Sequence, residues 1–292
     1  MDRIFSMPGN EAMAEKLRQT TAIDAGLFEI RHFPDGETYV RVSIDVKGLS
    51  VAVLCTLANP DEKLLPVIFL AEALRGAGAL EITLVAPYLS YMRQDKRFLP
   101  GEALTSVTFA GLISSSFNRL ITVDPHLHRH KSMDELYTIP CSVLHASGVM
   151  AQYISENISR PLVVGPDSES RQWVSEVATK AGAPYIVLEK ERVSDNEVII
   201  HLNAAKGFEG HTPVLVDDII STAHTMTETV KQLRTAGLGA PVCMGVHPVF
   251  AGNSFRMLLE AGVKSVVTCD TIPHHSGVIS VAGLLGDELN RH

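Results

Sequence analysis

An alternation of helical stretches and short apolar strands recurs along the chain. Four times, a stretch with helical character ends near a glycine and is followed by a run rich in Val and Ile. Glycine just past a helix, followed by β-branched residues, is typical of the αβ half of a parallel-sheet unit. The predicted helix and strand pairs are 64–75 with 82–86, 173–180 with 185–188, 226–234 with 242–246, and 255–260 with 266–269.

Further short apolar runs predict the remaining strands. They are apolar on both faces, which is typical of parallel strands covered by helices on each side. Because the alternation occurs in both halves, we predict an α/β protein with two domains, residues 1–145 and 146–292. Each domain is expected to be doubly wound around a mostly parallel central sheet, with ligand sites at the carboxyl ends of its strands. The last residues of the chain are expected to be able to pack back on the N-terminal domain. The additional strands are predicted at 51–55, 120–123, 142–144, 162–164 and 214–216.

Composition narrows the classes of protein. The chain has 292 residues, of which 46% are hydrophobic and 20% charged, and this suffices for two buried cores. A net charge of -8 argues against a nucleic-acid-binding surface. No apolar stretch approaches the roughly 20 residues that span a bilayer, and the start of the chain lacks a signal-peptide pattern, so no membrane partner and a cytoplasmic location are expected. The four cysteines are far apart and predict reduced thiols, without a disulfide or zinc site. They are Cys55, Cys141, Cys243 and Cys269.

The most informative segment is 214–225. An apolar run ends in Asp217 and Asp218, and a hydroxyl-rich turn with Ser221 and Thr222 then opens the next predicted helix. The acids suit ribose hydroxyls or a magnesium ion, and the turn with the free N–H groups of a new helix suits a phosphate. An ordinary loop with a helix N-cap has the same pattern. The segment alone does not decide between these interpretations.

Two other segments have the same ambiguity. The turn at 33–37 is either a plain Pro-Asp-Gly turn or a site where Phe33 stacks on a flat ring and Asp35 and Glu37 accept from an exocyclic amine. After the predicted strand 82–86, Arg93 and Arg97 belong to a cationic cluster. Such a cluster suits a polyphosphate, because arginine makes forked contacts, but it equally describes a solvated surface.

Three further segments follow predicted strands. The histidines at 126, 128 and 130 do not converge as a zinc site requires, so His126 at a magnesium-nucleotide site is the preferred interpretation. Asp167 is a helix cap, a metal and phosphosugar contact, or both. Lys190 and Arg192 lie in a polar segment that either faces solvent or closes over a transferring phosphoryl group. The chain has no GxxxxGK[ST] sequence, which excludes ATP binding by a Walker loop.

Taken together and in this order, these segments resemble the ribose-phosphate diphosphokinase (phosphoribosyl diphosphate synthase) family, most closely its archaeal-type branch. The similarity covers nearly the whole chain and implies two phosphoribosyltransferase-like domains. The matching motifs are FPDGE at 33–37, PYLSYMRQDKRF at 87–98, VDPH at 123–126, GPDSES at 165–170, EKER at 189–192, VDDIIST at 216–222 and DTIP at 270–273.

The resemblance implies transfer of the diphosphate of Mg-ATP to the 1-hydroxyl of ribose 5-phosphate, giving 5-phosphoribosyl 1-diphosphate and AMP. It also implies Mg²⁺ as the cofactor and a homo-oligomer with the ATP site near a subunit interface. By this analogy, ATP is bound by Phe33, Asp35, Glu37, Arg93, Gln94 and Arg97; Mg²⁺ by His126 and Asp167; and ribose 5-phosphate by Asp217, Asp218, Ser221, Thr222, His224 and Thr225, while Lys190 and Arg192 are catalytic.

One departure from the family pattern concerns the sugar loop. The family has a glycine or another small residue where this chain has His224, which either donates to the phosphate or weakens sugar binding. Two other functions stay open. A regulatory homologue of the same fold would bind nucleotide and associate with an active synthase. A phosphoribosyltransferase would share the sugar loop, but it would explain neither the turn at 33–37 nor the Arg93 cluster.

Overall fold

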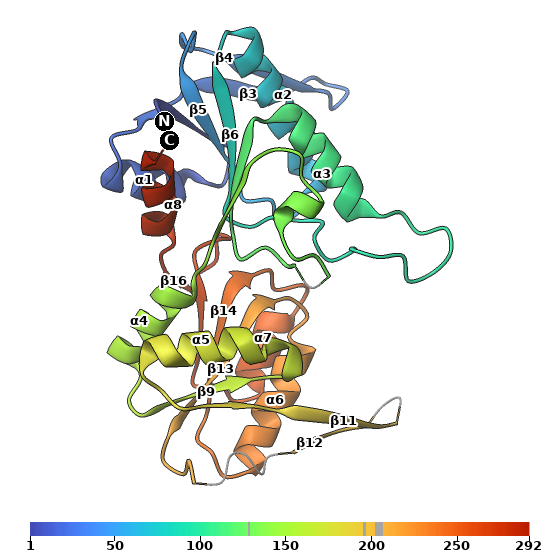
Figure 1. Cartoon of the computed structure of the whole chain (residues 1–292), viewed down its shortest axis with the longest axis vertical. Coiled ribbons are helices and arrows are strands. Elements are labelled where there is room, and N and C mark those ends of the chain that lie inside the picture. Colours follow the sequence, from blue (N-terminus) through green and yellow to red (C-terminus); the bar gives the residue numbers. More distant parts are fainter. Residues whose placement is uncertain (128, 195–196, 202–206, 292) are drawn as a thin grey trace. The chain divides into compact units, whose positions relative to one another are not determined.

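The chain forms two compact units in the computed structural model. The structure describes residues 1–127, 129–194, 197–201 and 207–291, with only the backbone for 169, 189–194 and 197–201. Unit 1 is Met1–Leu144 with Val281–His292, and unit 2 is His145–Ser280. Each contains a six-stranded sheet in which all strand pairs are parallel (Figure 1). The predicted α/β class is therefore confirmed.

The sheet of unit 1 has the strand order β2-β1-β5-β6-β7-β8. Its strands are β1 (Arg3–Ser6), β2 (Asp24–Ala25), β5 (Ser50–Leu54), β6 (Glu81–Ala86), β7 (Arg119–Val123) and β8 (Cys141–Leu144). Helices connect most of these strands, as parallel pairing requires. They are α1 (Glu11–Thr20), α2 (Asp61–Gly76) and α3 (Thr105–Ser116), followed by the short 3-10 helix η1 (Met133–Glu135).

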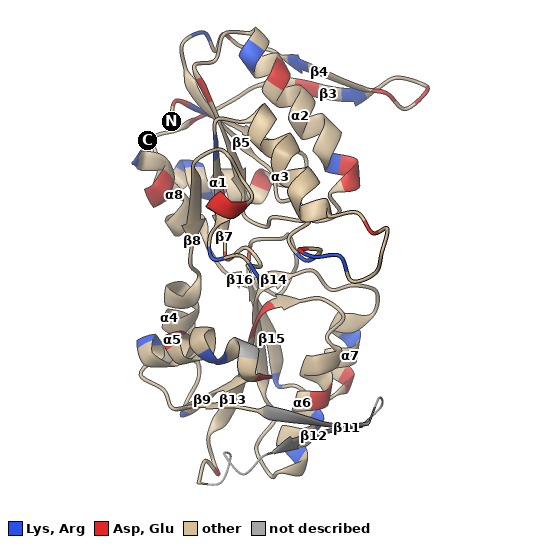
Figure 2. Cartoon of the chain, turned by 45° about the vertical axis from the view of Figure 1, so that its right-hand side comes forward, with Lys and Arg blue, Asp and Glu red and all other residues tan. Residues whose placement is uncertain are grey.

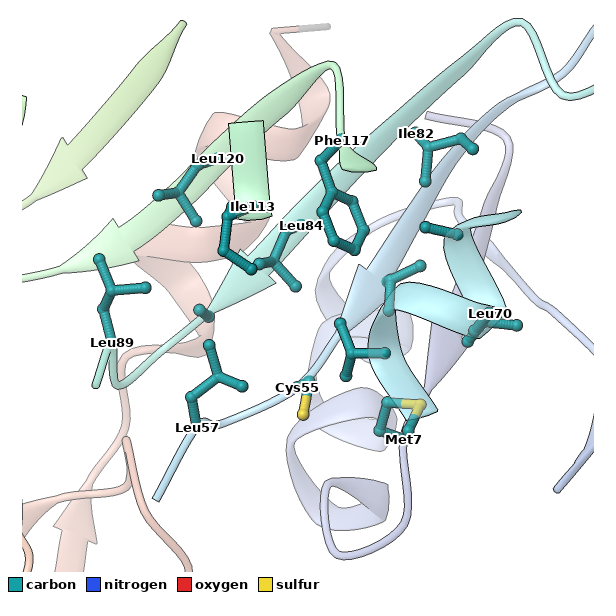
Figure 3. Packing of buried hydrophobic residues seen from close by; sticks show 14 of the residues in the cluster. Met7, Cys55, Leu57, Leu70, Ile82, Leu84, Leu89, Ile113, Phe117 and Leu120 are labelled. Atoms are coloured by element: carbon teal, nitrogen blue, oxygen red, sulfur yellow. The ribbon is translucent and has the colours of Figure 1, made fainter. Parts of the chain in front are cut away.

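Alternate residues of the central strands form the core of unit 1. Ile82 and Leu84 of β6 point to the same face of the sheet, where α3 contributes Ile113 and the following Phe117 (Figure 3). All four side chains are buried. Burying one such side chain stabilises the fold by about 1.5–3 kcal/mol. This packing holds the ends of β6 and β7, and therefore the loops that follow them, in place.

A β-hairpin extends from unit 1. It consists of β3 (Phe28–His32) and β4 (Thr38–Val42), paired antiparallel from Phe28 opposite Val42 to His32 opposite Thr38. The apolar residues Ile30 and Val40 pack against the core, whereas the turn between the strands is exposed. Figure 2 shows acidic residues at the tip of this hairpin. The apolar pattern of the sequence does not predict these two strands, because both are only partly buried and lack a continuous apolar run.

The C-terminal helix α8 (Ala282–Asn290) belongs to unit 1 and packs against α1 and β8. Its Glu288 is buried and accepts a hydrogen bond from Ser142 Oγ at 2.6 Å and one from Arg291 Nη1 at 3.1 Å. A buried carboxylate needs such donors, because an unpaired buried charge is strongly destabilising. These bonds fix the end of the chain on unit 1.

The sheet of unit 2 has the strand order β10-β9-β13-β14-β15-β16. Its strands are β9 (Pro161–Gly165), β10 (Tyr185–Val187), β13 (Thr212–Ile220), β14 (Val242–Pro248), β15 (Ser265–Cys269) and β16 (Gly277–Ile279). A separate antiparallel ribbon pairs β11 (Glu189–Ser194) with β12 (Glu197–His201). The helices are α4 (Ser147–Asn157), α5 (Arg171–Ala181), α6 (His224–Thr235) and α7 (Ser254–Glu260), with the 3-10 helix η2 (Ser168–Ser170) before α5.

Two boundaries differ from the predictions made for segment 214–225. The strand does not stop before the acids: β13 includes Asp217 and Asp218 and continues to Ile220, because pairing with β14 persists to Pro248. Helix α6 begins at His224, two residues earlier than predicted. Of the helices that the structure describes, none has both the length and the apolar character needed to cross a membrane.

Candidate functional site

The strand order of unit 2 reverses between β9 and β13, and three carboxylates follow these two strands. Ligands of open parallel sheets bind at such a reversal, outside the carboxyl ends of the strands. Asp167 comes two residues after β9, and Asp217 and Asp218 lie near the carboxyl end of β13. The register pairs Val164 with Leu215, so Asp167 and the two acids of β13 lie toward the same, carboxyl-terminal edge of the sheet.

The acids form an electrostatically unfavourable group. Burial raises the pKa of Asp217 well above its ordinary value, and the nearby carboxylates of Asp218 and Asp167 raise it further. Backbone donors hold the side chains in place: the N–H of Asp218 donates to Asp217 Oδ1 at 3.0 Å, and the N–H of Ile219 donates to Asp218 Oδ1 at 2.8 Å. A divalent cation or a set of hydroxyl donors would relieve the repulsion.

The donor set fits Mg²⁺, a hard cation that prefers oxygen ligands. Within the described ranges, no group of three or more His, Cys, Asp or Glu side chains is arranged to hold a metal by itself. Magnesium sites commonly use only one or two carboxylates, with water and substrate phosphates as the other ligands. The acidic edge would therefore bind Mg²⁺ together with a phosphorylated substrate.

Asp167 acts as a helix cap. It is the N-cap of η2, and its Oδ1 accepts a hydrogen bond from the N–H of Ser170 at 3.3 Å. Gly165, just before it, permits this tight turn, because a Cβ there would lie 2.5 Å from Ser170 Oγ. The capping interpretation of Asp167 is thus observed, and its role as a metal ligand stays a prediction.

A loop rich in hydroxyl groups follows β13; we call residues 221–225 the hydroxyl loop. Thr222, His224 and Thr225 are exposed in it. Its last two residues, His224 and Thr225, are the first two of α6, whose N-cap residue Ala223 makes no side-chain cap hydrogen bond. The first N–H groups of a helix have no partner within the helix, and here they lie at this loop. Free amides and a positive helix end are favourable for an anion.

Ala223 is the conformationally unusual residue of the hydroxyl loop. Its backbone is left-handed, with φ 58° and ψ 9°, and its carbonyl accepts from the N–H of Thr227 at 2.8 Å. His224 is the first residue of α6. The family has a small residue at position 224, but the left-handed conformation that would favour glycine occurs at Ala223. Nothing in the residue type predicts this, since alanine rarely adopts φ > 0.

In unit 1 the corresponding reversal, between β1 and β5, is occupied by protein. Asn10 Oδ1 accepts from the N–H of Thr56 at 2.7 Å, and its Nδ2 donates to the carbonyl of Met7 at 3.1 Å. Lys63 Nζ also donates to the carbonyl of Thr56 at 2.9 Å. These bonds link the ends of the two strands directly. The residues predicted to bind ATP lie instead after β6 and on the hairpin, and the predicted metal ligand His126 lies after β7.

An ion pair joins the loops after β6 and β7. Arg129 Nη1 donates to both carboxylate oxygens of Asp95, at 2.7 and 2.9 Å, and the Asp95 side chain is only 3% exposed. The segment containing Arg93 is thereby held next to the segment containing His126. No local pattern predicts this ion pair, because the two residues are 34 positions apart in the chain.

The predicted phosphate-binding residues of this region differ in their surroundings. Gln94 Oε1 accepts from Thr105 Oγ1 at 3.0 Å, at the start of α3. Arg97 Nε donates to the carbonyl of Glu102 at 2.9 Å. Both Arg93 and Arg97 are exposed, and His126 is half-buried. Arg93, Gln94 and Arg97 thus lie in the segment after β6, and the predicted metal ligand His126 lies in the segment after β7.

The hairpin turn is a tight turn with an exposed aromatic ring. The N–H of Phe33 donates to the carbonyl of Glu37 at 2.8 Å, and Gly36 has φ 93°. Phe33 is 42% exposed, and the guanidinium of Arg31 lies 5.0 Å from the centre of its ring. Asp35 and Glu37 are also exposed. Stacking of Phe33 on a base stays a prediction.

The two predicted catalytic residues lie on β11. In the antiparallel ribbon Lys190 pairs with Ile200, and Arg192 pairs with Val198. Their side chains lie outside the described part of the structure. The polar segment that contains Lys190 and Arg192 therefore forms a strand.

Both units match known protein families. Residues 3–116 match the N-terminal domain of ribose phosphate pyrophosphokinase, and residues 132–282 match the phosphoribosyl transferase domain. A solved structure titled phosphoribosylpyrophosphate synthetase from Mycobacterium smegmatis has the same fold, with a TM-score of 0.86, 24% identity, and coverage of 99% of this chain and 98% of that one. The fold class is thus a pair of phosphoribosyltransferase-type α/β domains.

Curated relatives identify the family more closely. The chain is 35% identical to ribose-phosphate pyrophosphokinase of Methanopyrus kandleri, over 91% of each chain. It is 31% identical to that of Methanosarcina acetivorans, over 99% of each, and 30% identical to ribose-phosphate pyrophosphokinase 1 of Listeria monocytogenes, over 99% of this chain and 93% of the relative. The chain belongs to the ribose-phosphate pyrophosphokinase family of enzymes.

The raised pKa of Asp217 leads to a prediction about stability. A raised pKa means that the folded state binds the proton more tightly than the unfolded state, so ionisation reduces stability as the pH rises. Asp217→Asn removes that charge and keeps an oxygen that can accept from the N–H of Asp218. We expect the melting temperature at pH 7 to rise by a few degrees, and the gain to disappear near pH 3, where both states are protonated. Thermal melts across pH test this, with the exposed Asp287→Asn as control; a lower melting temperature at pH 7 would contradict it.

The left-handed backbone of Ala223 leads to a second prediction. A left-handed alanine costs about 1–2 kcal/mol, which Ala223→Gly removes, but the variant also loses a buried methyl group and adds unfolded-state freedom. These effects nearly cancel, so we expect the free energy of unfolding to change by less than about 1 kcal/mol. Ala223→Val places a β-branched residue in a buried left-handed position and should lose about 2 kcal/mol or more. Urea unfolding measures the free energy of unfolding of both variants. Equal stability of Ala223→Gly and Ala223→Val would contradict the left-handed conformation of Ala223.

Proposed function

We propose that this enzyme transfers the diphosphate group of Mg-ATP to the 1-hydroxyl of ribose 5-phosphate, giving 5-phosphoribosyl 1-diphosphate and AMP. The observation that supports it most is the edge of unit 2 between β9 and β13. There, an acidic pair is followed, after two isoleucines, by the hydroxyl loop and the N-terminus of α6. Diol-binding acids next to a phosphate-binding loop match the two ends of a ribose 5-phosphate molecule.

In this proposal unit 2 binds the sugar. Asp217 and Asp218 accept hydrogen bonds from the ribose hydroxyls. The 5-phosphate lies in the hydroxyl loop, where Ser221, Thr222 and Thr225 and the first amides of α6 donate to its oxygens. His224, exposed at the first position of α6, is available to donate as well. The left-handed Ala223 turns the chain so that successive N–H groups face the anion.

Unit 1 binds ATP in this proposal. Arg93, Gln94 and Arg97 follow β6 and hold the phosphates, with the Arg129 to Asp95 ion pair keeping this segment next to His126. His126 would serve a magnesium site of unit 1 and Asp167 one of unit 2, each with substrate phosphates as further ligands. When bound, the metal neutralises phosphate charge and polarises the group that is transferred.

The adenine would be bound by the hairpin. Phe33 exposes its ring at the turn, and the carboxylates of Asp35 and Glu37 lie beside it in sequence and can accept from the exocyclic amine. An exposed aromatic ring on a projecting hairpin suits contact with the site of a second subunit. We therefore propose a homo-oligomer in which the hairpin of one subunit completes the ATP site of its neighbour.

The transfer itself demands electrostatic help more than covalent catalysis. The 1-oxygen of the sugar forms a bond to the β-phosphorus and its proton passes to solvent, while the bond from that phosphorus to the oxygen of the α-phosphate breaks and AMP leaves with the bonding electron pair. Negative charge develops on the transferred group and on the leaving oxygen. In the proposal, Lys190 and Arg192 of β11 offset that charge, as preorganised cations do most effectively.

Release of AMP tests the proposal directly. Purified protein is incubated with Mg-ATP and ribose 5-phosphate, and AMP and 5-phosphoribosyl 1-diphosphate are measured; both should appear in equal amounts and only when both substrates are present. Protein that binds nucleotide but forms no AMP, under varied phosphate and metal, would support a regulatory homologue. Product formed from a nucleobase in place of ATP would support a phosphoribosyltransferase.

The role of β11 gives the corresponding variant. We expect Lys190→Ala to lower kcat by roughly 10²-fold or more while the KM for ribose 5-phosphate changes little, because a cation that acts mainly on developing charge affects the transition state. The matched control is Lys231→Ala, on α6, whose ammonium group pairs with Glu228 on the surface. A kcat that stays within threefold of the unsubstituted enzyme would remove Lys190 from the catalytic residues.

A further inference from the structure

The segment after β14 continues the backbone pairing of the sheet onto the hydroxyl loop. β14 ends at Pro248, opposite Ile220. Beyond it, the N–H of Phe250 donates to the carbonyl of Ile220 at 2.9 Å, and the N–H of Ala251 donates to the carbonyl of Ser221 at 3.1 Å. These two bonds fix the first residue of the hydroxyl loop from the side of β14.

Phe250 makes the second of these bonds possible by an unusual backbone conformation. Its φ is 40°, in the left-handed region where a bulky residue is a genuine outlier. Such a conformation persists only where the surroundings determine it, and it is most common at functional sites. It turns the chain so that the next amide, that of Ala251, also faces the loop.

The ring of Phe250 supplies these surroundings. It packs half-buried against the core of unit 2, with its centre 5.1 Å from the ring of Phe255 and 4.6 Å from the ring of His274. The ring of His274 is itself held: the N–H of Ser276 donates to its Nδ1 at 3.2 Å, and Ser276 Oγ lies 2.7 Å from the same atom. Tilted aromatic pairs at these distances are favourable.

We propose that Phe250 is a positioning residue for the 5-phosphate of ribose 5-phosphate. Its ring holds the backbone in the left-handed conformation, and the backbone in turn holds Ser221 at the start of the hydroxyl loop. The inference rests on the proposed binding of ribose 5-phosphate by that loop. Phe250 need not touch the sugar; it acts through the carbonyl groups of Ile220 and Ser221. Loss of its ring leaves the fold in place and loosens the loop.

Steady-state kinetics test the role. We expect Phe250→Ala to raise the KM for ribose 5-phosphate roughly tenfold while the KM for ATP stays within about twofold, because only the sugar loop is displaced. Phe250→Tyr keeps the ring and should restore the lower KM, and Phe250→Leu keeps apolar bulk for the core and should give an intermediate value. The matched control is Phe208→Ala, which removes a ring packed on the same core near the amino end of β13.

Hydrogen exchange provides a readout that does not depend on activity. Amides of residues 219–225 should exchange faster in Phe250→Ala than in Phe208→Ala. If exchange in this segment is unchanged, or if Phe208→Ala raises the KM for ribose 5-phosphate equally, the positioning role is wrong. If the unsubstituted protein neither releases AMP nor binds ribose 5-phosphate, the proposed function fails, and the exchange result alone decides whether Phe250 holds the loop.

Discussion

The register between β13 and β14 is the constraint on which the site of unit 2 depends. Pairing continues past Asp217 and Asp218 to Ile220, so the backbone of both acidic residues is held in the sheet. Burial and like charge then raise the pKa of Asp217, and the folding of the sheet has to offset this unfavourable energy. A divalent cation or further hydrogen-bond donors at this edge would lower that energy.

The two units use similar sheets differently. In unit 2 Asp167 follows β9 and the acidic pair lies near the carboxyl end of β13, whereas in unit 1 Asn10 links the ends of β1 and β5. The predicted nucleotide residues of unit 1 consequently follow β6 and β7, where the Arg129 to Asp95 pair joins their segments. This difference fits a division in which one unit binds the sugar and the other binds a polyphosphate.

Sequence pattern predicted the fold well where local signals agree with tertiary packing. Strands β5 to β9 and helices that end near glycine were found, because burial on both faces leaves a continuous apolar run. Helix α3 was missed, since it contains no charged residue and exposes Val107 and Leu112, so no amphipathic stripe marks it. At the site, residue types pointed to the acids and the hydroxyl loop. The left-handed Ala223 depends on long-range context and had no local signal.

Strained backbone conformations occur beyond the carboxyl ends of strands in both sheets. In the part of the chain that the structure describes, six residues other than glycine have positive φ, and five of them follow the carboxyl end of a parallel strand. These five are Asn59, Tyr91, Asp124, Ala223 and Phe250. A simple turn would more often use glycine, because side chains make this conformation costly. Side chains at these positions must therefore make contacts that offset the conformational cost. The ring of Phe250, packed against the rings of Phe255 and His274, is an example.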